Sequence, residues 1–311
     1  NTGHALHGDT VQVQLFPRRQ GRKPEGRIKK VVKRAKMQFV GTLQASARYA
    51  FVLPDQNNVP IDIYITKDQL RGAKDGEKVL VKITDWPARS KNPFGEIVEI
   101  LGKPGDNEVE MLSILANNDF PLHFPKAAEK EAEKIPVEIP AEEIKRRKDL
   151  RNITTLTIDP ADAKDFDDAL SLKRLQNGNF EVGVHIADVS YYVKPGSKID
   201  KEAFERATSV YLVDRTIPML PEKLSNGLCS LRPNEDKLCF SAIFELDDEA
   251  KVLKQWFGKT IINSDRRFNY EEVQAMIEGG HGDLKEELLT LDMLAKKLRS
   301  KRFKAGSINF K

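Results

Sequence analysis

Five aspartates stand within ten residues of the sequence, accompanied by one basic side chain. They are Asp159, Asp162, Asp165, Asp167 and Asp168, and the basic residue is Lys164. Carboxylates this close together repel one another unless a cation compensates their charge. Hard divalent cations prefer oxygen ligands, and Mg²⁺ in proteins is commonly held by a few carboxylates together with substrate phosphates. The stretch therefore predicts a magnesium site that acts on a phosphate-containing substrate.

The spacing disfavours two other metals. An EF-hand calcium loop beginning at Asp165 would need glycine at its sixth position, where Leu170 stands. Zinc sites use cysteine and histidine ligands, but His185 is the only histidine close to the aspartates in sequence, and no cysteine is near. The histidines show no metal-ligand spacing, and we expect each to be structural or exposed: His4, His7, His123, His185 and His281.

A strongly basic segment precedes the aspartates by more than a hundred residues. Residues 17–36 contain ten Lys or Arg residues and one acid, Glu25, whereas the whole chain carries a net charge of only +4. A solvated linker can have this composition. Beside an acidic metal site, however, the segment suggests a polyanionic substrate that binds to the basic residues and is cleaved at the metal site.

The composition is that of a soluble globular protein with two or three domains. The chain has 311 residues, of which 40% are hydrophobic and 32% charged. It has no apolar run near the roughly 18 residues that a membrane span needs, and no secretory leader follows Asn1. Cys229 and Cys239 are too few for a disulfide framework. We therefore expect reduced thiols, a cytoplasmic location and no membrane partner.

Residues 37–103 predict a small β-barrel. Turn residues separate five short apolar runs, at 39–43, 49–53, 61–65, 78–83 and 95–100. Five such strands suit a closed barrel of the oligonucleotide-binding type. Tyr49 and Phe51 share one face of a strand because they are two residues apart. Together with Tyr64 they could stack on unpaired bases, although core aromatics would fit the same pattern.

The flanking segments divide the rest of the chain. Residues 1–36 hold two strand patterns, at 10–16 and 27–34. Residues 104–150 form a connector with helices predicted at 111–115, 127–134 and 141–151. From residue 151 the pattern is mixed α/β. There we expect strands at 153–158, 169–175, 180–187, 238–246, 252–262 and 306–310, and helices at 197–207, 221–231, 270–278 and 284–304.

Four motifs together carry a resemblance to a known family. They are TIDPADAKDFDDA at 157–169, VHIADVS at 184–190, YLVDRTIPMLP at 211–221 and LCSLRPNE at 228–235. In this order they resemble the ribonuclease II/ribonuclease R exoribonucleases, and the two-barrel layout favours ribonuclease R. The resemblance implies four parts. Residues 1–36 would end a first cold-shock (OB-type) domain, 37–103 form a second, 104–150 a helical connector and 151–311 the N-terminal part of an RNB catalytic domain.

The resemblance also implies a reaction. Family members hydrolyse RNA processively from its 3′ end and release nucleoside 5′-monophosphates, with two Mg²⁺ ions at the active site. By position, the catalytic and metal-binding residues would be Asp159, Asp165, Asp167 and Asp168. Asp159 and Asp168 would be the firmest ligands and Asp167 the residue most needed for chemistry, while Asp162 lies outside the set. Tyr211 would stack near the 3′-terminal base. We expect single-stranded or 3′-overhang RNA as the partner of a monomer.

Two departures from the family pattern limit these expectations. A downstream arginine, a second stacking aromatic and an S1 domain have no counterpart in the 311 residues. We therefore expect a chain truncated within the RNB domain and no appreciable activity from these residues alone. The barrel has Arg48–Val52 (RYAFV) where GFGFV is usual. The alternative function is a non-catalytic RNA-binding or chaperone protein built on cold-shock modules, which leaves the aspartates without a role.

Overall fold

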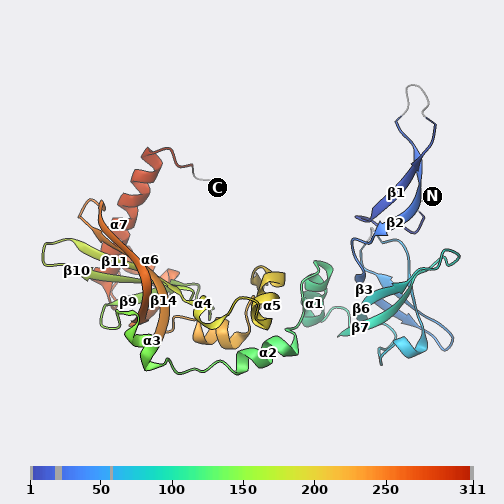
Figure 1. Cartoon of the computed structure of the whole chain (residues 1–311), viewed down its shortest axis with the longest axis horizontal. Helices are drawn as coiled ribbons and strands as arrows, with labels where there is room; N and C mark the ends of the chain where they lie inside the picture. Colours follow the sequence, from blue (N-terminus) through green and yellow to red (C-terminus); the bar gives the residue numbers. More distant parts are fainter. Residues whose placement is uncertain (1–2, 18–22, 57–58, 309–311) are drawn as a thin grey trace. The chain divides into compact units, whose positions relative to one another are not determined.

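The structure is a computed structural model, and it describes residues 3–17, 23–56 and 59–308 (Figure 1). The chain forms two compact units, Asn1–His123 and Phe124–Lys311. Within the described residues no helix is long and apolar enough to cross a membrane. The four-part division predicted from the sequence stays a prediction.

The first unit contains the predicted barrel. Five strands close it in the order β3-β4-β5-β7-β6. Their bounds are β3 Gln38–Ala45, β4 Ala50–Pro54, β5 Ile63–Ile65, β6 Lys78–Asp85 and β7 Phe94–Gly102. Inward-facing aliphatic side chains such as Leu43, Val52 and Ile97 are fully buried. The strand alternation thus builds the core, because every second side chain points inward.

A hairpin and a helix complete this unit. Strands β1 (Thr10–Leu15) and β2 (Gly26–Lys33) pair antiparallel, as their alternation predicts. Helix α1 (Asn107–Asn117) packs Val109 and Ala116 against barrel residues, while the short helix η1 (Lys67–Gln69) follows β5. Of the basic segment, Arg18, Arg19 and Arg22 lie outside the described residues.

A seven-stranded sheet organises the second unit. Its order is β16-β9-β10-β11-β14-β15-β8. The strands are β8 Lys148–Asp149, β9 Thr155–Asp159, β10 Asp168–Arg174, β11 Phe180–Ala187, β14 Asp236–Leu246, β15 Val252–Asn263 and β16 Arg266–Asn269. The strands predicted at 169–175 and 180–187 form a hairpin through Asn177-Gly178, and Gly178 adopts a positive φ of 86° there.

Helices and one small hairpin surround the sheet. The helices are α2 Lys126–Glu133, α3 Ala141–Lys145, α4 Val189–Tyr192, α5 Lys198–Arg206, α6 Tyr270–Ile277 and α7 Lys285–Lys304, with a π-helical turn η2 at Lys223–Leu228. Strands β12 (Val210–Tyr211) and β13 (Thr216–Ile217) form the hairpin. The helix predicted at 197–207 is confirmed as α5, and Ser197 caps it because its hydroxyl accepts from the amide of Asp200.

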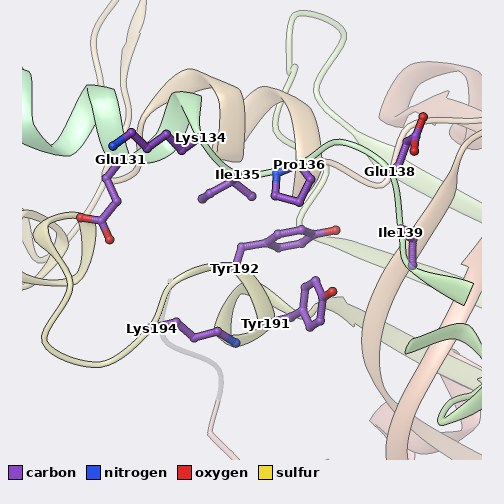
Figure 2. A pocket seen from close by; sticks show the side chains of 9 residues that line it. All are labelled: Glu131, Lys134, Ile135, Pro136, Glu138, Ile139, Tyr191, Tyr192 and Lys194. Atoms are coloured by element: carbon purple, nitrogen blue, oxygen red, sulfur yellow. The ribbon is translucent and has the colours of Figure 1, made fainter. Parts of the chain in front are cut away.

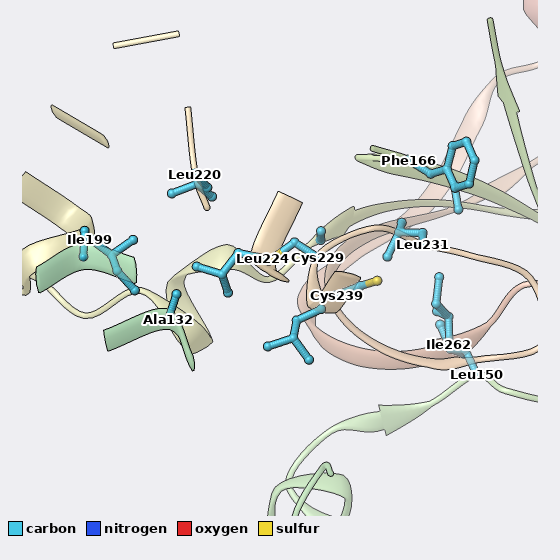
Figure 3. Packing of buried hydrophobic residues seen from close by; sticks show 14 of the residues in the cluster. Ala132, Leu150, Phe166, Ile199, Leu220, Leu224, Cys229, Leu231, Cys239 and Ile262 are labelled. Atoms are coloured by element: carbon cyan, nitrogen blue, oxygen red, sulfur yellow. The ribbon is translucent and has the colours of Figure 1, made fainter. Parts of the chain in front are cut away.

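The largest apolar cluster joins helices and sheet (Figure 3). Ala132 of α2, Ile199 of α5 and Leu224 of η2 meet at one end, and Cys239 and Ile262 continue the cluster to the sheet. Both cysteines, Cys229 and Cys239, are buried and free. The packing therefore fixes η2 against the strands. The residues that follow η2 contact the aspartate loop.

The helix predicted over 141–151 forms only in its first part. Helix α3 ends at Lys145, and Lys148 and Asp149 pair in parallel with β15 as strand β8. The reason is Arg147, whose side chain is fully buried. Its guanidinium donates to Asp188 Oδ2 at 2.7 Å and to the carbonyls of Cys239 and Thr260. These partners lie on distant segments, so tertiary contacts override the local helical composition.

The predicted strand at 306–310 is also not formed where the structure describes it. Gly306 has a positive φ of 98° and its amide bonds to the carbonyl of Phe303, which makes a turn after α7. The rest of that prediction falls on residues outside the described part of the chain.

A buried polar chain crosses four strands of the sheet. His185, which is fully buried, lies 2.7 Å from Ser241 Oγ through Nδ1 and 2.9 Å from Ser171 Oγ through Nε2. Ser241 continues to Thr260. Burial lowers the pKa of His185 to about 4 because the charged imidazolium would be desolvated. The expectation of a structural histidine fits these contacts.

This histidine predicts an acid-sensitive stability. Below about pH 6.5 the unfolded chain protonates at His185, but the folded chain does so only near pH 4, so acid favours unfolding. We expect His185 to cost about 3 kcal/mol of stability as the pH falls from 6.5 to 4. Urea unfolding at several pH values checks this. The His185→Gln variant should lose this part of the slope, and an unchanged slope would contradict the assignment.

Candidate metal-dependent RNA-cleavage site

The aspartate loop connects the ends of two neighbouring strands inside the sheet. Strand β9 ends at Asp159, and β10 begins at Asp168. The two strands are antiparallel neighbours, with Leu156 opposite Leu170. The loop between them must therefore reverse direction, which returns Asp168 toward Asp159 even though nine positions separate them.

The loop is tied to the segment after η2. The Ser230 hydroxyl donates to the carbonyl of Lys164 at 2.8 Å and accepts from the amide of Phe166 at 3.1 Å. The carbonyl of Phe166 accepts from the amide of Leu231. Ser230 is fully buried and the Phe166 ring is 7% exposed, so the loop has a defined path. This anchor holds Asp165 and Asp167 on either side of Phe166.

The side chain of Asp159 is partly buried and close to other carboxylates. Its Oδ2 is buried and has no hydrogen-bond partner among the described residues. Burial raises the pKa of Asp159, and the Asp168 and Asp165 carboxylates add to the rise. The Thr157 hydroxyl, which is buried without a hydrogen bond of good geometry, and the Arg267 guanidinium act in the opposite direction. A cation at this oxygen would relieve both burial and repulsion.

Asp167 feels the same repulsion. Partial burial raises its pKa, and the carboxylates of Asp165 and Asp168 raise it further, although more than a third of the residue's surface is exposed. Its backbone carbonyl accepts from the amide of Ala187, which fixes the end of the loop on β11. Asp162 is exposed within the loop. The charges of the four predicted residues are therefore coupled.

The fit to a divalent cation rests on charge and on donor chemistry. Oxygen donors, an unpartnered buried Oδ2 and mutual repulsion suit Mg²⁺. Across residues 3–17, 23–56 and 59–308, however, no three carboxylate, imidazole or thiol side chains stand in a metal-binding arrangement. The described loop thus brings the carboxylates into electrostatic contact without converging them on one point. Their assignment as ligands stays a prediction.

Tyr211 lies beside this loop. Its hydroxyl donates to Asp165 Oδ2 at 3.2 Å, while 68% of the residue's surface is exposed. Partial burial and the Asp165 carboxylate raise the pKa of Tyr211. The hairpin β12–β13 supports it, with Tyr211 opposite Thr216. An exposed aromatic ring is therefore held next to the carboxylates from a segment 46 positions away.

The barrel aromatics form a continuous row. Tyr49 contacts Phe51 with ring centroids 5.8 Å apart, and Phe51 contacts Tyr64 at 5.3 Å. Phe94 extends the row, 5.3 Å from Tyr64. Sequence reasoning missed Phe94, because the pairing of β5 with β7 that brings it beside Tyr64 joins segments 30 positions apart. Tyr49 is 55% exposed, so the row reaches the surface.

A pocket of about 360 Å³ lies in the second unit and contains none of the aspartates (Figure 2). Tyr191 and Tyr192 from α4 line one side, facing Ile135 and Pro136 of the segment after α2. Lys194 contacts the Tyr191 ring at 5.2 Å, and Arg147 does so at 5.4 Å. The Tyr191 ring thus already makes cation–π contacts with two side chains of the protein. Because none of the aspartates lines the pocket, it is not a part of the candidate site.

Comparisons with known proteins define the class. The RNB domain model matches residues 147–311, and a cold-shock domain model matches residues 51–125. The chain is therefore a cold-shock barrel followed by an RNB region. It belongs to the ribonuclease R/ribonuclease II family of RNB proteins.

Two relatives show the extent of the match. Ribonuclease R of Thermotoga maritima is 39% identical over 99% of this chain and 44% of its own length. Ribonuclease R of Mycoplasma genitalium, solved with ribose-methylated single-stranded RNA, gives a TM-score of 0.89 at 25% identity over 99% of this chain and 50% of that one. The same enzyme has been solved with double-stranded RNA. The chain thus spans about half the length of these relatives or less.

A third comparison separates fold from activity. The structure of yeast Ssd1, described as a pseudonuclease, gives a TM-score of 0.71 at 23% identity, covering 97% of this chain and 44% of that chain. At that identity the likeness concerns the fold alone. The fold therefore does not decide whether a chain cleaves RNA, and activity depends on the side chains of the site.

Proposed function

We propose that the whole protein is a 3′→5′ exoribonuclease, which degrades single-stranded or 3′-overhang RNA processively to nucleoside 5′-monophosphates. The observation that carries the proposal is the buried, unpartnered Oδ2 of Asp159 within a loop of mutually repelling carboxylates. Homology to ribonuclease R supports it. Two buried free cysteines favour the reducing cytoplasm. Action as a monomer stays a prediction.

In this proposal Asp159, Asp165, Asp167 and Asp168 hold Mg²⁺. The chemistry that such bound ions supply is activation of water and stabilisation of the attacking and leaving oxygens of an in-line displacement. The aspartate loop keeps its carboxylates together at the ends of β9 and β10 because Ser230 and Leu231 anchor its backbone. Its role is therefore to concentrate negative charge where cations must neutralise both the protein and the RNA phosphate.

Tyr211 would orient the RNA end. Its exposed ring offers a face for the terminal base, and its hydroxyl is held by Asp165. Stacking of this kind holds a nucleotide without reading its sequence. The row Tyr49–Phe51–Tyr64–Phe94 on the barrel would bind unpaired RNA in the same sequence-tolerant way.

The proposal is tested with RNA labelled at its 5′ end. We expect Mg²⁺-dependent loss of the full-length RNA and direct appearance of a short 5′-labelled limit product, with few intermediates because degradation is processive. Chromatography of the unlabelled products should show nucleoside 5′-monophosphates. Chelation of the metal should stop hydrolysis but leave binding by the barrel row intact. The non-catalytic alternative, which the aromatic row and its exposed Tyr49 favour, predicts salt-dependent RNA binding without any Mg²⁺-dependent release.

Tyr211 can be tested separately. Replacing it with alanine should weaken binding of the RNA end by about 1–3 kcal/mol, the usual value of one stacked base. We also expect a longer smallest product, because the terminal nucleotide is no longer held. The Tyr211→Phe variant keeps the ring and loses only the hydrogen bond to Asp165, so it serves as the control. Gel analysis of limit products checks this, and equal products from all three proteins would contradict it.

A further inference from the structure

Arg267 contacts the aspartate loop from a strand that the proposed site does not otherwise use. It lies on β16, which pairs in parallel with β9 and places Arg267 opposite Thr157. Its guanidinium Nη2 donates to the carbonyls of Pro160 and Ala161 at 2.6 and 2.8 Å. These are the first two residues after Asp159. One side chain thus bonds to the point where the chain leaves β9.

The same guanidinium also reaches the far end of the loop. Its carbon atom Cζ lies 5.4 Å from the centroid of the Phe166 ring, within the range of a cation–π contact. Phe166 is buried and stands between Asp165 and Asp167. Arg267 therefore contacts both ends of the turn. The path of the loop depends on this clamp as well as on the Ser230 anchor.

Two buried polar atoms at this place have no hydrogen-bond partner within the part of the chain that the structure describes. Arg267 Nε, a donor, is buried without a hydrogen bond, and so is the acceptor Asp159 Oδ2. The positive charge of Arg267 acts on Asp159 directly. A buried donor and a buried acceptor left unpaired cost free energy. Arg267 donates to the loop backbone and not to Asp159 Oδ2. That oxygen is therefore still able to bind a cation.

We propose that Arg267 is a positioning residue for the metal-binding aspartates, which holds residues 160–166 in the shape that binds a divalent cation. The proposal rests on the proposed function, since it assigns Arg267 to the same site. Loss of the Arg267 charge and loss of its contacts to the loop should change the affinity for a divalent cation in opposite directions. Removing a positive charge beside carboxylates should by itself tighten cation binding, whereas losing a clamp on the ligand loop should weaken it.

The chain offers a matched control in the neighbouring residue. Arg266 precedes Arg267 on β16, and successive residues of a strand point to opposite faces. Its guanidinium contacts Glu272 Oε1 at 3.5 Å and lies over the Phe268 ring. No hydrogen bond of Arg266 to the aspartate loop is present in the described structure. The two variants remove the same charge at nearly the same place in sequence.

The experiment measures binding of Mn²⁺, as a substitute for Mg²⁺, by calorimetry with the whole protein. We expect Arg267→Met to weaken binding by about 10-fold or more, the usual effect of losing an outer partner of metal ligands. Arg267→Lys should fall between, because it keeps the charge but has no planar fork for two carbonyls. Arg266→Met should bind as tightly as the unsubstituted protein or more tightly.

Hydrogen exchange supplies a readout independent of metal and activity. In Arg267→Met the amide of Ala163, which donates to the carbonyl of Pro160, and that of Phe166, which donates to Ser230 Oγ, should exchange faster while β14 and β15 stay protected. Binding that is unchanged or tighter in Arg267→Met would overturn the proposal. The proposed function would survive that result as long as Asp167→Asn still abolishes hydrolysis. Absence of Mn²⁺ binding in the unsubstituted protein would overturn both.

Discussion

Asp167→Asn in the whole protein is expected to lower the rate of RNA hydrolysis by about 10³-fold or more, since bound metal contributes several kcal/mol of transition-state charge stabilisation. The substitution keeps the size of the side chain and removes its charge. The backbone carbonyl of Asp167 still accepts from the amide of Ala187, so the end of the loop beside β11 should keep its shape. RNA binding should therefore be nearly unchanged, because the barrel row lies in the other unit.

Asp162→Asn is the matched control for this prediction. Asp162 belongs to the same loop, loses the same charge and is exposed to solvent. We expect its hydrolysis rate to stay within a few fold of the unsubstituted enzyme. Single-turnover hydrolysis of labelled RNA and equilibrium binding measure the two quantities. Mononucleotide release by Asp167→Asn at an undiminished rate would remove Asp167 from the chemical step.

The largest effect on stability is expected for Arg147→Met. The substitution strands the buried Asp188 carboxylate and deprives the carbonyls of Cys239 and Thr260 of their donor. Breaking a buried ion pair from one side costs about 3–5 kcal/mol. The Arg147 guanidinium and the Ser190 hydroxyl together hold the pKa of Asp188 below its ordinary value despite burial, so this carboxylate is charged at neutral pH. Lys259, 3.6 Å away, compensates only partly because its side chain is half exposed.

Two further variants separate charge from bulk. Arg146→Met alters the exposed neighbour and should change stability by no more than about 0.5 kcal/mol. Adding Asp188→Asn to Arg147→Met removes the stranded charge and should recover part of the loss. Urea unfolding at neutral pH, monitored in the second unit, measures all three. Equal stabilities of Arg146→Met and Arg147→Met would show that the ion pair is not a major contributor.

Local sequence signals predicted the elements whose causes are local. The Asn177-Gly178 turn requires a positive φ, and Ser197 caps a helix through a partner three residues away. The barrel strands follow from alternation alone. The helix predicted over 141–151 forms only in its first part because Arg147 is held by residues 41 to 113 positions away, which no local pattern records.

The candidate site was predictable in its residue types and not in its support. The aspartates, Tyr211 and the barrel aromatics stand out by composition and by motif. Ser230 lies within the motif at 228–235, but the motif does not reveal its role, and Arg267 lies in no motif, since their contacts to the loop span 64 to 107 positions. An ordinary serine and an ordinary arginine acquire their roles only when the sheet brings β16 beside β9 and packs η2 beneath the loop.

The hydroxyl of Ser230 bridges two backbone groups of a turn that lies far ahead of it in the chain. The acidic turn is consequently not a portable module. Grafted alone onto another scaffold, the stretch from Asp159 to Asp168 would keep its charges and lose its shape. Any transplant, or any designed variant of this centre, has to carry the downstream segment around Leu228–Leu231 along with it.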